Sequence, residues 1–140
     1  MVSCNSKKLK PMPKMKIDAV SVTSRNMVKT AKFFSLLGFE FPIFEPDTKH
    51  LEPITKEGDV RLMIDDRAFM KSMTGKDPTP PSHATFAIKC GSPGEVDQCV
   101  ERVKAAGFEV MKEPWDAFWG QRYATLVDPD GYIIDVFAWL

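Results

Sequence analysis

The sequence predicts an α+β fold in which two similar βαβββ halves follow one another within a single domain. Short apolar segments typical of strands alternate with two amphipathic helix patterns. The chain also repeats itself at offsets of 69, 68 and 73 residues, in the pairs Gly38-Phe39-Glu40 with Gly107-Phe108-Glu109, Glu45-Pro46 with Glu113-Pro114, and Gly58 with Gly131. Matches in one order with a drifting offset are typical of duplicated modules with loop insertions.

Composition excludes several classes of protein. The chain has 140 residues, a usual length for one domain, with 19 basic and 19 acidic residues. A balanced charge gives no overall attraction to nucleic acid or to an anionic membrane surface, and no apolar run is long enough for a membrane span. The three cysteines form no CxxC pair and their odd number argues against a disulfide framework. We therefore expect a cytoplasmic protein.

The first fifteen residues are basic and contain no acidic residue. We interpret residues 1–15 as a solvated tail, because a secretory signal would need an apolar segment that is not present. A transit peptide is a weaker alternative, since this stretch lacks arginine. The single domain then covers residues 16–140, with module one at 16–70, a linker at 71–82 and module two at 83–140.

In the first half, Ser24 or Asn26 can cap a helix whose apolar residues recur at helical spacing, and Gly38 can end it. We expect strands at residues 17–22, 39–44, 51–55 and 60–64. The segment 71–82 contains one glycine and three prolines, a composition that resists both helix and sheet.

The second half repeats this plan. Ser92 followed by Pro93 and Glu95 is a strong helix start, and Gly107 closes the helix. We expect strands at residues 83–88, 108–111, 122–127 and 132–137. The last two strands are joined by the turn Asp128-Pro129-Asp130-Gly131.

The segments 19–40 and 83–140 carry a resemblance to a known superfamily. The most specific pieces are Trp119-Gly120-Gln121-Arg122 and the stretch from Asp128 to Phe137, DPDGYIIDVF. Over nearly all of residues 16–140 the chain resembles the glyoxalase/bleomycin-resistance/extradiol-dioxygenase superfamily, also called vicinal oxygen chelate proteins. The resemblance implies two βαβββ modules that form a curved mixed-sheet cup, often completed across a dimer, so a homodimer is expected.

The resemblance also implies where a metal would bind. Metal-dependent members take ligands from the first and last strands of each module. In module one these positions fall on Ala19 and near Leu62, which offer no donor, whereas module two offers His83 and Asp135. Two protein donors are fewer than the three usual at catalytic zinc sites, so a divalent metal (Zn, Ni, Mn or Fe) at His83 and Asp135 stays an alternative only.

His50 and Glu52 are of ligand type, but their spacing does not place them in the cup.

Asp135 lies in an apolar strand, and a lone buried carboxylate there is costly unless it is paired, protonated or exposed to water. It therefore faces a polar cup, a partner or solvent. Alternation along strands predicts two faces, one with Ile133, Asp135 and Phe137, the other with His83, Thr85 and Ala87. The resemblance implies that both faces line the cup. A hydrogen bond between His83 and Asp135 would orient the imidazole as a base without any metal.

The aromatic segment 114–120 is a second candidate site. Trp115, Phe118 and Trp119 are costly to leave exposed in a loop. One interpretation is that they cap the core or pack at a dimer seam; the other is that they form a wall over the cup and stack on a ligand. Arg122 would either clamp a carboxylate or phosphate, or pair with Asp116 or Asp128.

These observations favour a glyoxalase-like protein that binds a small organic ligand, by sequestration or by acid–base chemistry through His83 and Asp135. The candidate ligand-binding residues are Trp115, Phe118, Trp119, Arg122, Thr85 and Phe137. Two alternatives stay open: a metal-dependent lyase or isomerase of the glyoxalase type, and a drug-sequestering resistance protein.

Overall fold

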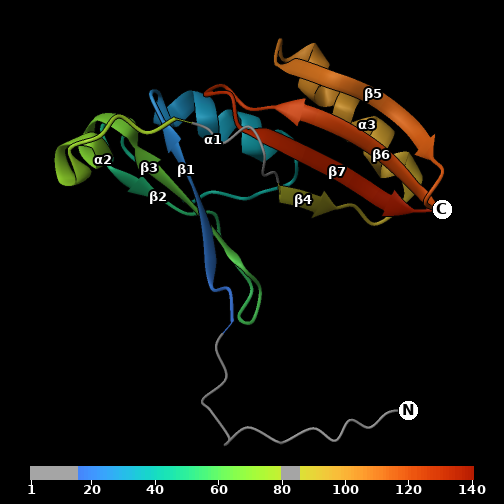
Figure 1. Ribbon diagram of the computed structural model, residues 1–140, viewed down its shortest axis with the longest axis horizontal. Coiled ribbons are helices and arrows are strands. Elements are labelled where there is room, and N and C mark those ends of the chain that lie inside the picture. The colour runs from blue at the N-terminus through green and yellow to red at the C-terminus, as the bar shows by residue number, and fades with distance from the viewer. Residues whose placement is uncertain (1–15, 80–85) are drawn as a thin grey trace, which may run out of the picture.

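A computed structural model describes residues 16–79 and 86–140 (Figure 1). The predicted tail at 1–15 and the candidate residues His83 and Thr85 lie outside the described residues. The first half contains β1 (Ala19–Ser24), α1 (Met27–Leu36), β2 (His50–Leu51), β3 (Arg61–Asp66) and α2 (Arg67–Thr74). The second half contains β4 (Phe86–Lys89), α3 (Pro93–Ala105), β5 (Glu109–Ala117), β6 (Gln121–Val127) and β7 (Ile133–Trp139).

The strands form two mixed sheets with related topology. Sheet one has the order β1-β3-β2, and sheet two has the order β4-β7-β6-β5. In each sheet the first strand of the half pairs in parallel with its last strand, β1 with β3 and β4 with β7, while the other pairs are antiparallel. This common plan confirms the predicted α+β class and the internal repeat. The second half is a complete βαβββ module.

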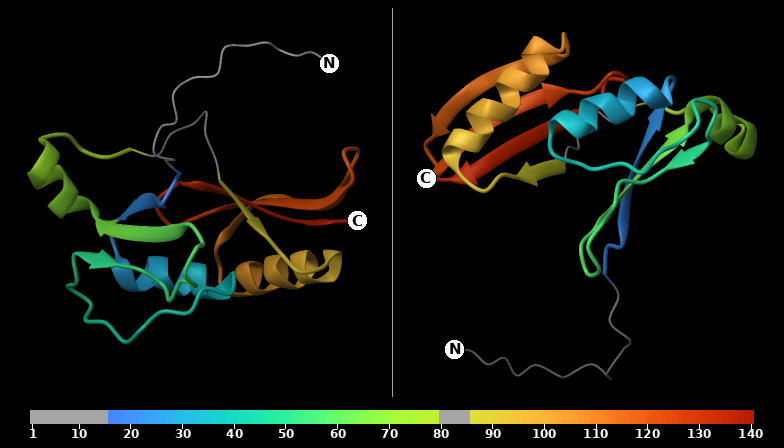
Figure 2. Two further views of the ribbon diagram at one scale, coloured as in Figure 1. Left: turned by 90° about the horizontal axis from the view of Figure 1, so that it is seen from below. Right: turned by 180° about the vertical axis from the view of Figure 1, so that it is seen from behind.

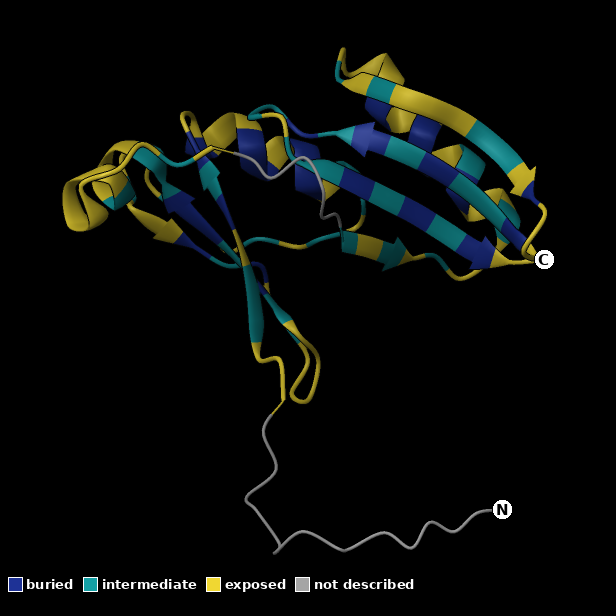
Figure 3. Ribbon diagram, viewed as in Figure 1, coloured by how far each residue is buried: buried dark blue, intermediate teal, exposed yellow. Residues whose placement is uncertain are grey.

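The helices α1 and α3 run nearly in line along one side of the molecule, and the strands form the other layer (Figure 2). Along β7, Ile134 and Val136 are fully buried whereas Ile133, Asp135 and Phe137 are partly exposed, which gives the alternating stripes in Figure 3. The buried set faces the helices. The opposite side of each sheet is called its open face below.

One apolar core joins the two halves. Phe33 and Phe34 of α1 are completely buried, and Phe33 makes an edge contact with Phe108 of the second half at 5.4 Å between ring centroids. The Arg102 side chain on α3 donates a hydrogen bond to the carbonyl oxygen of Leu36 at 3.1 Å. Because the helices share this core, both sheets are covered from the same side.

The predicted helix ends are confirmed. Asn26, not Ser24, caps α1 by accepting a hydrogen bond from the Lys29 amide, and Ser92 caps α3 by accepting from the Glu95 amide. Gly38 and Gly107 follow these helices with φ of 102° and 84°, a left-handed conformation that glycine adopts without strain.

Three predicted segments differ from the structure. Residues 39–44 are not a strand. Pro42 has no amide hydrogen to donate, and within residues 16–79 and 86–140 the one ladder-like bond of this segment runs from the Ile54 amide to Glu40. Of the predicted strand at 51–55 only Leu51 is in a strand, as the second residue of the two-residue β2. The first four residues of the predicted linker belong to α2, which Asp66 caps and Gly75 ends; the prolines that argued against a helix come after it.

The strand β5 is longer than the predicted 108–111. It continues to Ala117, so Trp115 lies in a strand opposite Tyr123 and not in a loop. The prediction ended this strand at residue 111 and placed the segment that begins at Pro114 in a loop. β5 is an edge strand with two register shifts, and proline is tolerated in such positions.

In the described part of the chain, no helix has both the length and the apolar character needed to cross a bilayer.

The turn between β6 and β7 contains the buried carboxylate of Asp128, and Asp130 in the same turn contacts the first half. Asp128 is 3% exposed, and its Oδ1 accepts hydrogen bonds from the amides of Asp130 and Tyr132, each at 2.9 Å. Its Oδ2 is buried and has no hydrogen-bond partner. Asp130 in the same turn pairs with Arg25 of the first half at 3.0 Å. Burial raises the pKa of Asp128 to about 6.

The raised pKa of Asp128 predicts that the free energy of unfolding falls as its carboxyl group ionises. A folded-state pKa raised above the ordinary value of 3.8 gives stability that is present below that value and is lost as pH rises through about 6. In Asp128→Asn the amide oxygen still accepts both hydrogen bonds but carries no charge. Relative to this variant, the wild-type free energy of unfolding should fall by at most about 3 kcal/mol between about pH 4 and about pH 7.

Urea denaturation across this pH range measures the difference. Asp59→Asn, at an exposed loop carboxylate, is the control and should follow the wild type. Parallel pH profiles for wild type and Asp128→Asn would contradict the assignment.

Candidate functional site on the open faces of the sheets

A carboxylate with two hydroxyl partners lies on the open face of sheet two. Asp135 on β7 is paired in register with Thr125 on β6, and Tyr123 lies two residues from Thr125 on the same face. The Tyr123 hydroxyl donates to Asp135 Oδ2 at 2.6 Å, and the Thr125 hydroxyl donates to Oδ1 at 2.9 Å. These partners explain how a carboxylate is accommodated in an apolar strand, and we call the three residues the Asp135 centre.

Tyr123 is suited to act as a donor in this centre. Burial raises the pKa of its phenol to about 12, and the hydrogen bond to Asp135 adds to this effect. The phenol therefore keeps its proton at neutral pH. It holds one carboxylate oxygen in place, while Thr125 holds the other.

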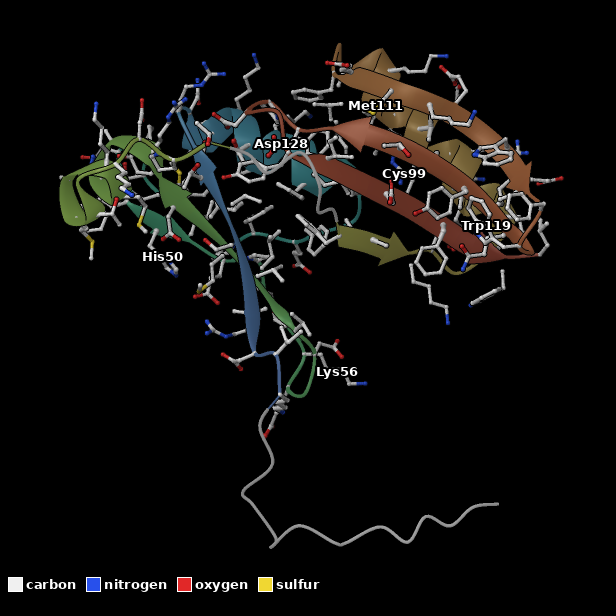
Figure 4. All side chains as sticks on the ribbon, in the orientation of Figure 1. His50, Lys56, Cys99, Met111, Trp119 and Asp128 are labelled. Atoms are coloured by element: carbon white, nitrogen blue, oxygen red, sulfur yellow. The ribbon has the colours of Figure 1, made fainter. Side chains whose placement is uncertain are left out.

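Aromatic rings surround one end of the Asp135 centre (Figure 4, Trp119 labelled). Tyr123 stacks on Phe137 with 6.3 Å between centroids, and Trp119 meets the edge of Tyr123 at 5.4 Å. Further edge contacts extend the cluster. We call it the aromatic wall; its members are Trp115, Phe118, Trp119, Tyr123, Phe137 and Trp139.

The aromatic wall does not cap the core, because none of its rings belongs to the cluster that joins the halves. Phe118, Trp119 and Trp139 are 92%, 44% and 59% exposed. Lys112 places its ammonium group 4.8 Å from the centre of the Trp115 ring, a cation–π distance. The wall is therefore a solvent-facing aromatic surface, which leaves a dimer seam and a ligand wall as its two interpretations.

Arg122 lies on the other side of β6. Its guanidinium donates to Asp97 of α3 at 3.0 Å and to Asp116 of β5 at 3.2 Å. These carboxylates raise the pKa of Arg122, and the hydrogen bond that Arg122 donates to Asp97 contributes most. Of the predicted alternatives, pairing with Asp116 is confirmed and pairing with Asp128 is not seen. Arg122 fastens β6 to α3 instead of facing the Asp135 centre.

The repeat shows which positions in the first half correspond to the Asp135 centre. Ala87 lies five residues before the cap Ser92 and pairs with Asp135. Ser21 lies five residues before the cap Asn26 and pairs with Met63. Met63 is therefore the equivalent of Asp135.

This register corrects the position near Leu62, which is only 4% exposed and belongs to the core. The same count changes the first-strand position in module two. Ala19 stands seven residues before its helix cap, and seven residues before Ser92 the sequence has Thr85, whereas His83 stands nine before it. By this spacing Thr85 corresponds to Ala19.

A second polar network lies on the open face of sheet one (Figure 4, His50 labelled). His50 Nδ1 contacts Asp65 Oδ1 at 2.6 Å, and Nε2 contacts Glu52 Oε2 at 2.7 Å. Ser21 donates to Asp65 at 3.1 Å, and Arg61 donates to Glu52 at 2.7 Å. These five side chains fasten β1, β2 and β3 together on one face.

The hydrogen bonds of this network favour the protonated form of His50. The hydrogen bond with Asp65, then the one with Glu52, raises the imidazole pKa, and His50 and Arg61 lower the pKa of Glu52. Sequence reasoning set His50 and Glu52 aside. Their spacing of two residues would have placed both on one face of a strand, but nothing in the sequence pointed to Asp65 as the shared partner.

Because its pKa is raised, His50 should contribute stability that is lost as pH rises above 6.5. Its folded pKa is raised above 6.5, so its stabilisation is complete below that value and is lost as pH rises through the folded pKa. His50→Asn should remove this slope. The effect should stay below about 1 kcal/mol, because solvent screens a half-exposed pair. Thermal unfolding between about pH 6 and about pH 9 measures it.

The chain has two histidines, so His83→Asn is the control and should keep the slope. A slope lost in His83→Asn and kept in His50→Asn would refute the assignment to His50.

Two halves of common topology, covered by helices on one side and open on the other, define the class of this protein. A family model for the Glyoxalase/Bleomycin resistance protein/Dioxygenase superfamily matches residues 16–136. The chain belongs to this superfamily. A comparison with curated protein sequences found no match.

Solved structures of similar fold agree with this assignment. A glyoxalase/bleomycin resistance protein/dioxygenase from Nocardioides is 24% identical, with a TM-score of 0.67, and the match covers 93% of this chain and 87% of that one. A family enzyme from Burkholderia phytofirmans PsJN is 19% identical, with a TM-score of 0.74 and coverage of 90% and 100%. A lactoylglutathione lyase from Agrobacterium tumefaciens is 19% identical, with a TM-score of 0.62 and coverage of 90% and 95%. At these identities the similarity shows the fold alone.

Members of the superfamily often bind divalent metals, so the donors on the open faces matter. Among residues 16–79 and 86–140, no group of three or more His, Cys, Asp or Glu side chains converges as a metal site. Both oxygens of Asp135 accept hydroxyl hydrogen bonds, and its equivalent Met63 offers only a thioether. The described donors therefore do not fit a divalent metal.

Proposed function

We propose that this protein binds a small organic molecule on the open face of sheet two. The observation that carries the proposal is the Asp135 centre, a carboxylate fixed by two hydroxyl groups beside exposed aromatic rings. A few well-placed polar groups within an apolar and aromatic lining are typical of ligand sites. The candidates Trp115, Phe118, Trp119 and Phe137 contribute rings, and Arg122 is left out because its two carboxylate partners occupy it.

The chemistry of this face favours a ligand with a positively charged amine. A carboxylate attracts an ammonium group, and the faces of aromatic rings attract cations. Lys112 already uses Trp115 in this way. The protein either sequesters such a ligand or accepts a proton from it on Asp135. In the second case His83, predicted from the sequence to bond with Asp135, would share the proton.

If the proposal is correct, the affinity for a charged amine depends on the negative charge of Asp135. The probe is 3-phenylpropylamine, compared with the uncharged 3-phenylpropanol. Asp135→Asn keeps the shape of the side chain but loses the charge, so the amine should bind at least about tenfold more weakly while the alcohol changes little. Isothermal titration calorimetry gives both dissociation constants.

Asp116→Asn is the matched control, since Asp116 is an exposed carboxylate on β5 that pairs with Arg122. Equal amine affinity for wild type and Asp135→Asn would contradict the proposal.

We further propose that the site works without a bound metal. Elemental analysis of the purified protein should find zinc, nickel, manganese and iron well below one per chain. Adding these ions after chelation should leave the melting temperature unchanged, because the described donors do not converge. A clear upward shift that is lost in His83→Ala would instead support the metal-dependent lyase or isomerase.

The remaining expectations, a cytoplasmic location and a homodimer, stay proposals. The Trp139 ring, which is 59% exposed and is not among the proposed ligand-binding rings, would lose contact with water in a seam between two chains. Analytical ultracentrifugation should give twice the mass of one chain, and Trp139→Ser should shift the protein toward monomer. A wild-type monomer at high concentration would refute the dimer.

A further inference from the structure

A cavity of about 330 Å³ lies where the two sheets meet. All eight residues that line it are apolar: Ile17, Val20, Phe39, Val60, Leu62, Phe86, Ala87 and Ile88. We call it the seam cavity. Its volume lies in the range of small-molecule pockets, and a dry apolar cavity about half as large already holds benzene.

The seam cavity arises from the topology. β1 and β4 are the outer strands of their sheets on this side, and each pairs with one neighbour only, β3 or β7. No ladder joins β1 to β4, so side chains from both strands border the space between them. At its rim Ile17 and Val60 are 73% and 52% exposed. The cavity therefore opens to solvent through apolar groups, which are costly to leave wet.

The seam cavity adjoins the Asp135 centre. Ala87, one of its lining residues, is paired in register with Asp135 across β4 and β7. Paired strands lie about 4.8 Å apart, so a spacer of three or four atoms spans the distance from the Ala87 side of the cavity to the carboxylate on the same face.

We propose that the seam cavity holds the apolar part, an aromatic ring or short alkyl chain, of a ligand whose polar group contacts Asp135. This inference rests on the proposed function and deepens it, because it names the ligand class as a small amphiphile. The ring displaces water from eight apolar side chains, and the polar group meets the carboxylate on the next strand.

Three probes test the two parts of the proposed site separately. Toluene tests the seam cavity, n-butylamine tests the Asp135 centre, and 3-phenylpropylamine tests both together. Ala87→Leu adds volume at the cavity wall on an exposed edge-strand position, where the fold tolerates it. Lys89→Leu makes a similar apolar change two residues away on the same face, outside the cavity lining. Dissociation constants come from calorimetry, and thermal melts confirm that each variant is folded.

We expect 3-phenylpropylamine to bind wild type at least about tenfold more tightly than n-butylamine. Ala87→Leu should weaken toluene and 3-phenylpropylamine by at least about tenfold and leave n-butylamine unchanged, whereas Lys89→Leu should leave toluene unchanged. No toluene binding to wild type, or equal weakening by both variants, overturns the inference.

Asp135→Asn separates failure of the cavity from failure of the proposed function. It should weaken both amines and leave toluene unchanged. If toluene binding depends on Ala87 while the amines ignore Asp135, the cavity stands and the proposed function fails. If the amines depend on Asp135 while toluene does not bind, the proposed function stands and the seam cavity fails.

Discussion

The shared core of α1 and α3 determines where this protein can have a site. Phe33 and Phe34 from the first half are fully buried, and Phe33 packs against Phe108 from the second. Since both helices belong to one core, both sheets turn their apolar side to it. The opposite side of each strand must then carry residues that tolerate water or a ligand, and alternation along the strands places Asp135 there.

The two open faces solve this requirement in different ways. Sheet one carries charged groups that bond to one another, with His50 between Asp65 and Glu52. Sheet two carries the Asp135 carboxylate with its two hydroxyl partners, a row of aromatic rings and the lysines Lys89 and Lys112. On sheet one the charged side chains pair with one another. On sheet two exposed aromatic rings leave an apolar surface that a ligand or a partner can cover. For this reason the ligand proposal concerns sheet two.

Local signals predicted the helices and most strands. Asn26, Ser92 and the two closing glycines act through neighbours in sequence, so their roles could be inferred directly. The repeat showed that the halves share a plan. By contrast, α2 was missed because the prolines after it dominated its composition. The predicted strand at 108–111 was too short, because the edge position that lets β5 continue through Pro114 is a property of the sheet.

The candidate site was predicted only in part. Strand alternation identified Asp135 and Phe137 as residues of one face. It did not identify Tyr123 and Thr125 as the partners of Asp135, because that contact depends on the register between β6 and β7. Register also exposed the wrong position near Leu62 and the role of Arg122 on the helix side. The seam cavity depends on two strands that are about 65 residues apart in sequence, and periodicity holds no information on it.

The central claim is that the open face of sheet two is the binding face. The chain has three tryptophans, Trp115, Trp119 and Trp139, and all of them belong to this face's aromatic wall. Their indole N–H signals can be followed one by one in a ¹H–¹⁵N NMR titration with 3-phenylpropylamine. The account predicts that these signals shift together with the amides of β6 and β7 and that the amides of α1 and α3 stay in place. Shifts confined to the helical layer or to the open face of sheet one would contradict it.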